Sequence, residues 1–225
     1  MPLAIPRKLI VLGDSGVVGW GDALEGGWCE RLRRHWMGLP DGPVLYPLGV
    51  RGDGLERVAA RLEPEVLCRG ELRRQTPHGI LLAVGLNDTA RVGRADGRPQ
   101  LDADAFLFGL QQLLIRARQI APVLVLGLTP VDEAAMPYAE MLWYGLEQVR
   151  RYEGLLEEAC LEADVPFLPL LEGLLADPRW LQWLGPDGLH LNTDGHRAVY
   201  ERVRQWPALL QWADLQPLQV HTPQR

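Results

Sequence analysis

Residues 9–16 read LIVLGDSG, an apolar run that ends in a short polar turn. A run of four apolar residues followed by glycine is typical of a strand that is buried on both faces of a parallel sheet. Similar short runs recur further along the chain, at residues 44–46, 80–84, 123–126 and 165–168. The sequence therefore predicts five strands of one parallel sheet.

The segments between these runs have the periodicity of amphipathic helices. From Phe106 to Ile120, apolar residues recur with the i, i+4, i+7 spacing of one helix face, and Asp102 is placed to cap its start. A second stripe runs from Leu142 to Cys160. Shorter helix candidates lie at residues 28–36, 55–67 and 196–203. Alternating strands and helices of this kind predict an α/β fold built as a three-layer α/β/α sandwich.

No internal repeat or linker-like stretch divides the chain. We therefore expect a single domain over residues 1–212. Residues 213–225 are rich in proline and glutamine and are expected to form a frayed tail. The polar segments 91–99 and 130–137 are expected to be exposed loops.

Composition excludes several classes of protein. The 23 basic and 29 acidic side chains give a net charge of −6, which argues against nucleic-acid binding. The apolar runs are too short to span a membrane or to form the core of a signal peptide. The 3 cysteines include no CxxC pair, so we expect neither a disulfide scaffold nor a cysteine-based zinc site. These features favour a cytoplasmic protein with reduced thiols.

Four polar turns are expected to meet at the carboxyl edge of the sheet, where open α/β proteins bind their ligands. One turn contains Ser15, the only serine in the chain. A serine hydroxyl needs a base within hydrogen-bond reach to act as a nucleophile. His190 can be that base, and Asp187, three residues earlier, can hold its other ring nitrogen. The sequence thus offers a Ser-His-Asp triad.

The same turns supply donors for the negative charge that develops on a carbonyl oxygen during acyl transfer. The candidates are the backbone N–H groups of Ser15 and Gly52 and the side-chain amide of Asn87. Glycine at position 52 lets the backbone approach a substrate closely and adopt a positive φ angle.

These motifs together resemble the GDSL (SGNH) hydrolases. The chain has GDS after the first strand, a glycine after the second, GxND after the third and DxxH near the end, and the resemblance covers residues 7–206. It implies a flavodoxin-like strand order of 2-1-3-4-5, with Ser15 as nucleophile, Asp187 and His190 completing the triad, and Gly52 and Asn87 in the oxyanion hole. Two residues depart from the family pattern. Pro47 stands where asparagine is common, and Gly54 where threonine or serine often follows Gly-Asp.

Other interpretations of these residues remain open at this point. Ser15 could simply cap a helix. His196 is expected to be a structural histidine. The acidic and histidine side chains from Asp187 to His196 match neither an HExxH nor a facial-triad pattern, and hard cations need more carboxylates, so we expect no metal site. The arginines of the polar loop either border the site and attract an anionic substrate or face solvent; they are Arg91, Arg94 and Arg98. The tryptophans near the motifs either line a pocket or pack in the core; they are Trp20, Trp28, Trp180 and Trp183.

We therefore predict a serine esterase that cleaves a small-molecule carboxylic ester through an acyl-serine intermediate, with no cofactor and no metal. Two alternatives use the same scaffold. One is a non-catalytic module that binds a small ligand, and the other is a thioesterase or acyltransferase with the same triad. Lipids, sugar acetates and aryl esters all suit this chemistry, because loops rather than the triad select among them.

Overall fold

The computed structural model describes residues 6–69 and 77–216. Its central sheet has five parallel strands in the order β2-β1-β3-β5-β7. The strands are β1 (Lys8–Gly13), β2 (Val44–Gly49), β3 (Gly79–Ala83), β5 (Val123–Leu126) and β7 (Phe167–Leu168). Numbered along the chain within this sheet, the order is 2-1-3-4-5, and the predicted topology is confirmed.

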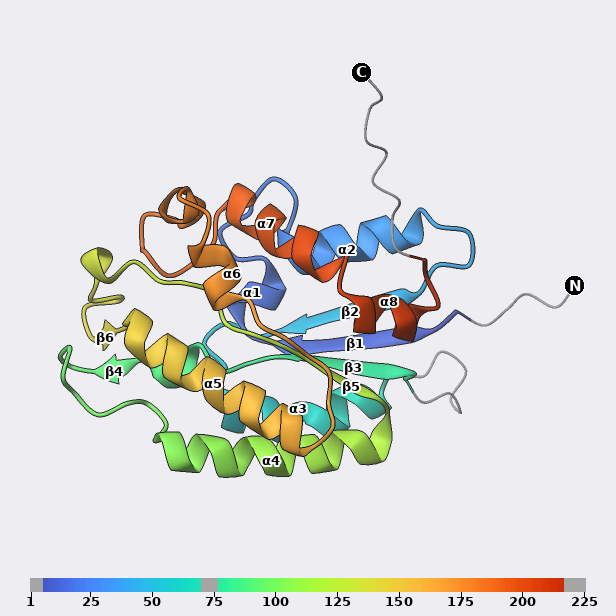
Figure 1. Cartoon of the computed structure of the whole chain (residues 1–225), viewed down its shortest axis with the longest axis horizontal. Coiled ribbons are helices and arrows are strands. Elements are labelled where there is room, and N and C mark those ends of the chain that lie inside the picture. Colours follow the sequence, from blue (N-terminus) through green and yellow to red (C-terminus); the bar gives the residue numbers. More distant parts are fainter. Residues whose placement is uncertain (1–5, 70–76, 217–225) are drawn as a thin grey trace, which may run out of the picture.

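The apolar runs are explained by helices that cover both faces of the sheet (Figure 1). In β1, Ile10 and Leu12 belong to one core cluster, whereas Leu9 and Val11 belong to the other. All four side chains are fully buried. Because neither face of the strand meets water, no polar residue alternates with the apolar ones.

Three helices pack on each face of the sheet, which confirms the three-layer sandwich (Figure 1). One layer consists of α3 (Leu55–Leu67), α4 (Ala103–Ile120) and α5 (Leu146–Glu162). The other consists of α2 (Gly27–Met37), α7 (Thr193–Val203) and α8 (Pro207–Ala213). Shorter helical turns are α1 (Ser15–Val18), η1 (Asn87–Thr89), η2 (Glu133–Ala135), α6 (Leu171–Leu175) and η3 (Trp180–Trp183). Among the described helices, none is long and apolar enough to cross a membrane.

One aspartate and one asparagine cap the first turns of two long helices, α4 and α7. Asp102 accepts a hydrogen bond from the Asp104 N–H and caps α4, as predicted. Asn192 caps α7 by accepting from the N–H groups of Asp194 and Gly195. Its amide nitrogen also donates to the backbone of the preceding turn, at Gln182 O and Leu184 O. Asn192 therefore ties the start of α7 to the segment that carries the DxxH motif.

The predicted start of the second long helix, at Leu142, is wrong. Leu142 lies in a short strand, β6 (Leu142–Trp143), and α5 begins only at Leu146. Strand β6 pairs antiparallel with β4 (Arg91–Val92), so the segment expected to be only an exposed loop contains a strand. The pairing depends on a partner about fifty residues away, and local periodicity carries no signal for such a contact.

The predicted frayed tail begins within a packed helix. Helix α8 extends to Ala213, which is buried, and Leu215 packs against the core beside it. The rest of that tail, residues 217–225, lies outside the described residues.

Candidate active site

The turns at the carboxyl ends of β1, β2 and β3 meet the loop that precedes α7. Together they line a pocket of about 370 Å³ that contains Ser15, Gly52, Asn87 and His190. Each of these residues follows a different strand or precedes the last long helix, so the fold joins positions that are far apart in the sequence. The structure thus brings the predicted site residues to one place.

Ser15 occupies the first turn of α1, directly after β1. The side chain that caps this turn belongs to Asp14, whose Oδ1 accepts from the Gly16 N–H at 2.8 Å. The alternative in which Ser15 serves as the cap is therefore wrong. Gly13, the last residue of β1, lets β3 and α1 approach closely, because a Cβ atom there would lie 2.4 Å from the Ala83 carbonyl oxygen and 2.5 Å from Val17 Cγ2.

Ser15, His190 and Asp187 form a continuous line of hydrogen bonds. Ser15 Oγ lies 3.1 Å from His190 Nε2, and His190 Nδ1 lies 2.7 Å from Asp187 Oδ2. The second carboxylate oxygen of Asp187 accepts from the N–H groups of Leu189 and His190. Burial acts to raise the pKa of Asp187, but these hydrogen bonds outweigh it and hold the pKa below its ordinary value. The carboxylate therefore stays ionised and keeps a proton on Nδ1, leaving Nε2 to accept from the serine.

Two residues that line the pocket have backbone N–H groups that could donate hydrogen bonds to a negatively charged oxygen. In the described chain, neither the Ser15 N–H nor the Gly52 N–H donates to another backbone oxygen. Gly52 has a φ of 77°, a conformation that side chains rarely adopt. Gly52 itself lines the pocket that contains Ser15 and His190.

The side-chain amide of Asn87 is more constrained than the sequence suggested. Its nitrogen donates to Asp14 Oδ2 at 3.0 Å and to the Asp53 carbonyl oxygen at 3.1 Å. Its oxygen accepts from the Tyr144 hydroxyl at 3.3 Å. All three contacts agree on which end of the amide is nitrogen. Both amide hydrogens already have protein acceptors, so Asn87 must share one of them with any substrate oxygen.

Comparison with known proteins places this chain in a family. A sequence profile of the GDSL-like lipase/acylhydrolase family matches residues 11–198. The chain belongs to this family. A GDSL esterase/lipase of Arabidopsis thaliana is 23% identical over 207 residues, covering 88% of this chain and 84% of the relative.

Solved structures of low sequence identity share the fold. A lipase/acylhydrolase from Enterococcus faecalis superposes with a TM-score of 0.73 at 20% identity, covering 95% of this chain and 99% of that one. Axe2, an acetylxylan esterase from Geobacillus stearothermophilus, gives a TM-score of 0.67 at 15% identity, covering 96% of this chain and 98% of its own. The predicted resemblance to GDSL hydrolases is confirmed.

The two departures from the GDSL pattern have structural reasons. Pro47 lies in β2, which is the edge strand of the sheet, where a missing N–H costs no ladder bond to a further strand. Gly54 makes room for Asp88, because a Cβ atom at position 54 would lie 2.5 Å from Asp88 Oδ1. The Asp88 carboxylate accepts from the Leu55 N–H at the start of α3. This buried contact shapes the loop that carries Gly52.

Three buried carboxyl groups lie beneath the pocket. Burial raises the pKa of Asp14 to about 6 and that of Asp88 to about 7. Asp53 instead forms an ion pair with Arg61 at 2.7 Å, and Arg61 also donates to the backbone of both flanking strands, at Gly13 O and Leu48 O. A single arginine thereby joins the nucleophile turn to the turn that carries Gly52.

An apolar cavity of about 60 Å³ adjoins the nucleophile. Its lining includes Ser15 and His190, together with the apolar side chains Trp28, Leu126, Leu128, Leu170 and Val199. Trp20 also lines it, whereas Trp183 is buried in the core and Trp180 packs against that core. Of the four tryptophans noted in the sequence, Trp20 and Trp28 therefore border the site, although Trp28 is also part of the core, and the other two serve only in packing.

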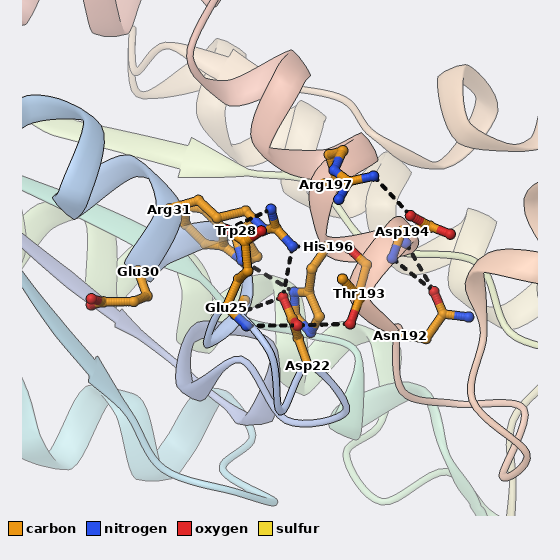
Figure 2. A network of polar contacts seen from close by, with 12 residues as sticks. Asp22, Glu25, Trp28, Glu30, Arg31, Asn192, Thr193, Asp194, His196 and Arg197 are labelled. Atoms are coloured by element: carbon orange, nitrogen blue, oxygen red, sulfur yellow. Dashed lines mark hydrogen bonds and ion pairs between the residues drawn. The ribbon is translucent and has the colours of Figure 1, made fainter.

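A network of polar contacts holds the segment after α1 against the start of α7 (Figure 2). The buried Asp22 carboxylate accepts from Arg31 at 3.0 Å and from the Thr193 hydroxyl at 2.8 Å. His196 Nδ1 accepts from the Trp28 N–H, and its Nε2 donates to the Trp20 carbonyl. His196 is thus the structural histidine that the sequence predicted, and it fixes the backbone next to the Trp20 ring.

The arginines of the polar loop do not line the pocket that holds Ser15 and His190. Arg91 donates to the Gly97 carbonyl, and Arg94 pairs with Asp96 on the exposed surface. The pocket is instead lined by residues that sequence reasoning missed: Arg51, Gln100, Tyr138 and Tyr144. The tyrosines come from the segment around β6, whose placement depends on the pairing with β4. In the described residues, no group of histidine, cysteine and acidic side chains could hold a metal ion.

Proposed function

We propose that this protein hydrolyses carboxylic esters, with Ser15 as nucleophile and His190 and Asp187 as its supporting pair. The observation that carries this proposal is the line of hydrogen bonds from Ser15 Oγ through the His190 ring to Asp187, at 3.1 Å and 2.7 Å. Membership of the GDSL family supports the same class of substrate.

In the first half of the reaction, His190 Nε2 takes the hydroxyl proton while Ser15 Oγ bonds to the ester carbon. The carbonyl oxygen becomes negative and receives hydrogen bonds from the N–H groups of Ser15 and Gly52, with Asn87 as a third donor. Each such donor contributes about 3–4 kcal/mol to transition-state stability. The tetrahedral species collapses, and His190 returns the proton to the departing alkoxide.

In the second half, water attacks the acyl-serine. His190 removes a proton from that water, and the same N–H groups stabilise the second oxyanion. Collapse releases the carboxylic acid and returns the proton to Ser15 Oγ. Asp187 stabilises the imidazolium in both halves without taking its proton.

The dimensions of the site favour short acyl groups. The apolar cavity beside Ser15 measures about 60 Å³, less than half of the roughly 150 Å³ cavity that holds benzene in an engineered protein. We propose that it takes the acyl chain, while the larger and more polar pocket takes the alcohol. An acetyl ester fits this division, and one structural neighbour is an acetylxylan esterase.

The decisive test is the variant Ser15→Ala. Hydrolysis of 4-nitrophenyl acetate should fall to the uncatalysed rate, while the far-UV circular dichroism and the melting temperature stay close to those of the parent protein. A fluorophosphonate should label the parent protein once, on the only serine in the chain, and should leave the variant unlabelled.

Full activity in the variant would refute the assignment of the nucleophile. An inert but folded parent protein would instead favour the non-catalytic binding module. Faster turnover of thioesters, or acyl transfer to added alcohols, would identify the thioesterase or acyltransferase alternative.

A further inference from the structure

Arg51 lies on the wall of the candidate active site, one residue before Gly52. It lines the same pocket as Ser15 and His190, and its side chain is exposed. Its guanidinium carbon lies 3.4 Å from the centroid of the Trp20 ring. A cation therefore lies over an aromatic ring on the wall of this pocket.

Two carboxylates on the turns that build the site already have partners. Asp53 pairs with Arg61, and the Asp187 carboxylate faces the His190 ring. Among the described residues, Arg51 has no hydrogen bond or ion pair to a carboxylate, in contrast to the paired Arg31, Arg61 and Arg116. The ring covers one face of the guanidinium and leaves its N–H edge available to a ligand.

The ring beneath Arg51 is itself held in place. The Trp20 backbone donates to the Ser15 carbonyl and accepts from His196 Nε2. The indole also meets the His190 ring edge-on, with centroids 6.3 Å apart. Stacking on such a ring reduces the rotamers open to the arginine, so less freedom is lost when a ligand binds.

We propose that Arg51 selects esters whose alcohol portion carries a negative charge, such as a carboxylate or phosphate. A guanidinium edge presents two parallel N–H donors that match these planar or tetrahedral anions. The proposal rests on the proposed function, because it assigns the acyl group to the apolar cavity. The alcohol then extends into the pocket lined by Arg51, Gln100 and Tyr138.

The positive charge of Arg51 contrasts with the negative net charge of the whole chain. With a net charge of −6, the protein repels anions at long range. A cation on the wall of the pocket that contains Ser15 and His190 supplies a local attraction that opposes this repulsion. Recognition of an anion here is therefore a property of one side chain, and one substitution should remove it.

The test compares 3-acetoxybenzoate with its neutral amide, 3-acetoxybenzamide, as substrates of the parent protein and of Arg51→Gln. The quantity of interest is the ratio of kcat/KM for the anionic ester to that for the neutral ester. Hydrogen bonds to a charged group typically contribute about 1.5–3 kcal/mol, so Arg51→Gln should lower this ratio about tenfold or more. The change should appear as a higher KM for the anionic ester. In the parent protein, the ratio should fall as salt is added, because salt screens the attraction between the two charges.

Two further variants sharpen the comparison. Arg51→Lys keeps the charge but loses the flat, two-pronged donor, and it should recover only part of the ratio. Arg151→Gln removes an equal charge from an exposed position on α5, outside both pockets, and should leave the ratio unchanged. An unchanged ratio in Arg51→Gln, or an equal fall in Arg151→Gln, would overturn the proposal.

Binding of the alcohol product separates this proposal from the esterase assignment. Calorimetry with 3-hydroxybenzoate and 3-hydroxybenzamide needs no turnover. The parent protein should bind the anion more tightly than the amide, and Arg51→Gln should lose that preference. Equal affinity for both compounds in the parent protein would refute the role of Arg51, even if both esters were hydrolysed. Failure to hydrolyse either ester would bear on the esterase assignment alone.

Discussion

Replacing Asp187 by asparagine tests how the histidine is oriented. Asp187 Oδ1 accepts from the N–H groups of Leu189 and His190, so the amide oxygen of an asparagine should take that place. Its NH2 group would then face His190 Nδ1, which now lies 2.7 Å from a carboxylate oxygen. Nδ1 would have to accept a proton rather than donate one. The hydrogen of the ring would move to Nε2, which faces Ser15 Oγ and could no longer take its proton.

The expected loss follows from that change of tautomer. A neutral ring of the wrong tautomer lowers kcat about 10⁴-fold, which corresponds to about 5 kcal/mol in the activation barrier. The assay is the initial rate of 4-nitrophenolate release from 4-nitrophenyl acetate at neutral pH. The melting temperature should change little, because both backbone hydrogen bonds survive.

The matched control is Asp177→Asn. Asp177 also accepts from a backbone N–H two residues ahead and pairs with Arg179, but it lies outside the site. The esterase activity of the Asp177→Asn variant should equal that of the parent protein. If Asp187→Asn retained more than about a tenth of the parent kcat in a folded protein, the role assigned to the pair would be refuted.

Two further predictions concern a tyrosine that lines the pocket and a carboxyl group beneath it. Tyr144→Phe removes the hydroxyl that holds the Asn87 oxygen at 3.3 Å; a neutral hydrogen bond contributes about 0.5–1.5 kcal/mol, so kcat should fall about 2- to 10-fold with KM little changed. Tyr200→Phe, whose hydroxyl meets His35 outside the site, is the control, and an equal loss there would contradict the positioning role. Burial raises the pKa of Asp88 to about 7, which means that the folded protein favours the protonated carboxyl group. The contribution of Asp88 to the free energy of unfolding is therefore fully present below the unfolded pKa of about 4 and is lost as the pH rises through 7. In urea titrations, Asp88→Asn should therefore gain stability relative to the parent protein between pH 5 and pH 8, and parallel profiles would argue against this shift.

The sequence predicted those parts of the molecule that depend on neighbours along the chain. Each buried strand is a short apolar run, and the stripe from Phe106 to Ile120 marks α4 because helix faces repeat locally. The site turns were found because parallel strands deliver their carboxyl ends to one edge. Ser15 and Asn87 follow strands of the same sheet, so their placement follows from the topology.

Contacts made by distant segments were not predictable in the same way. Strand β6 exists only because β4 lies beside it, and that pairing helps to place Tyr144 against Asn87. The engagement of both amide hydrogens of Asn87 depends on Asp14 and on the Asp53 carbonyl, which come from two other turns. No local pattern marks Arg51 as a site residue, because its significance comes from contact with the Trp20 ring, about thirty residues earlier in the chain.

The placement of His196 makes the rim of the site sensitive to acid. Burial lowers the pKa of this histidine, although its bond to the Trp20 carbonyl and the nearby Asp22 favour the charged ring. The neutral ring accepts from the Trp28 N–H, and this stabilising contribution is present above the ordinary histidine pKa and is lost as the pH falls through the lowered value. A protonated ring would present a hydrogen to that N–H and weaken the support of Trp20 and Arg51. Tryptophan fluorescence should then change at a higher pH than the pH at which the chain unfolds. Fluorescence that stays constant until the chain unfolds would contradict a separate loosening of the rim on protonation of His196.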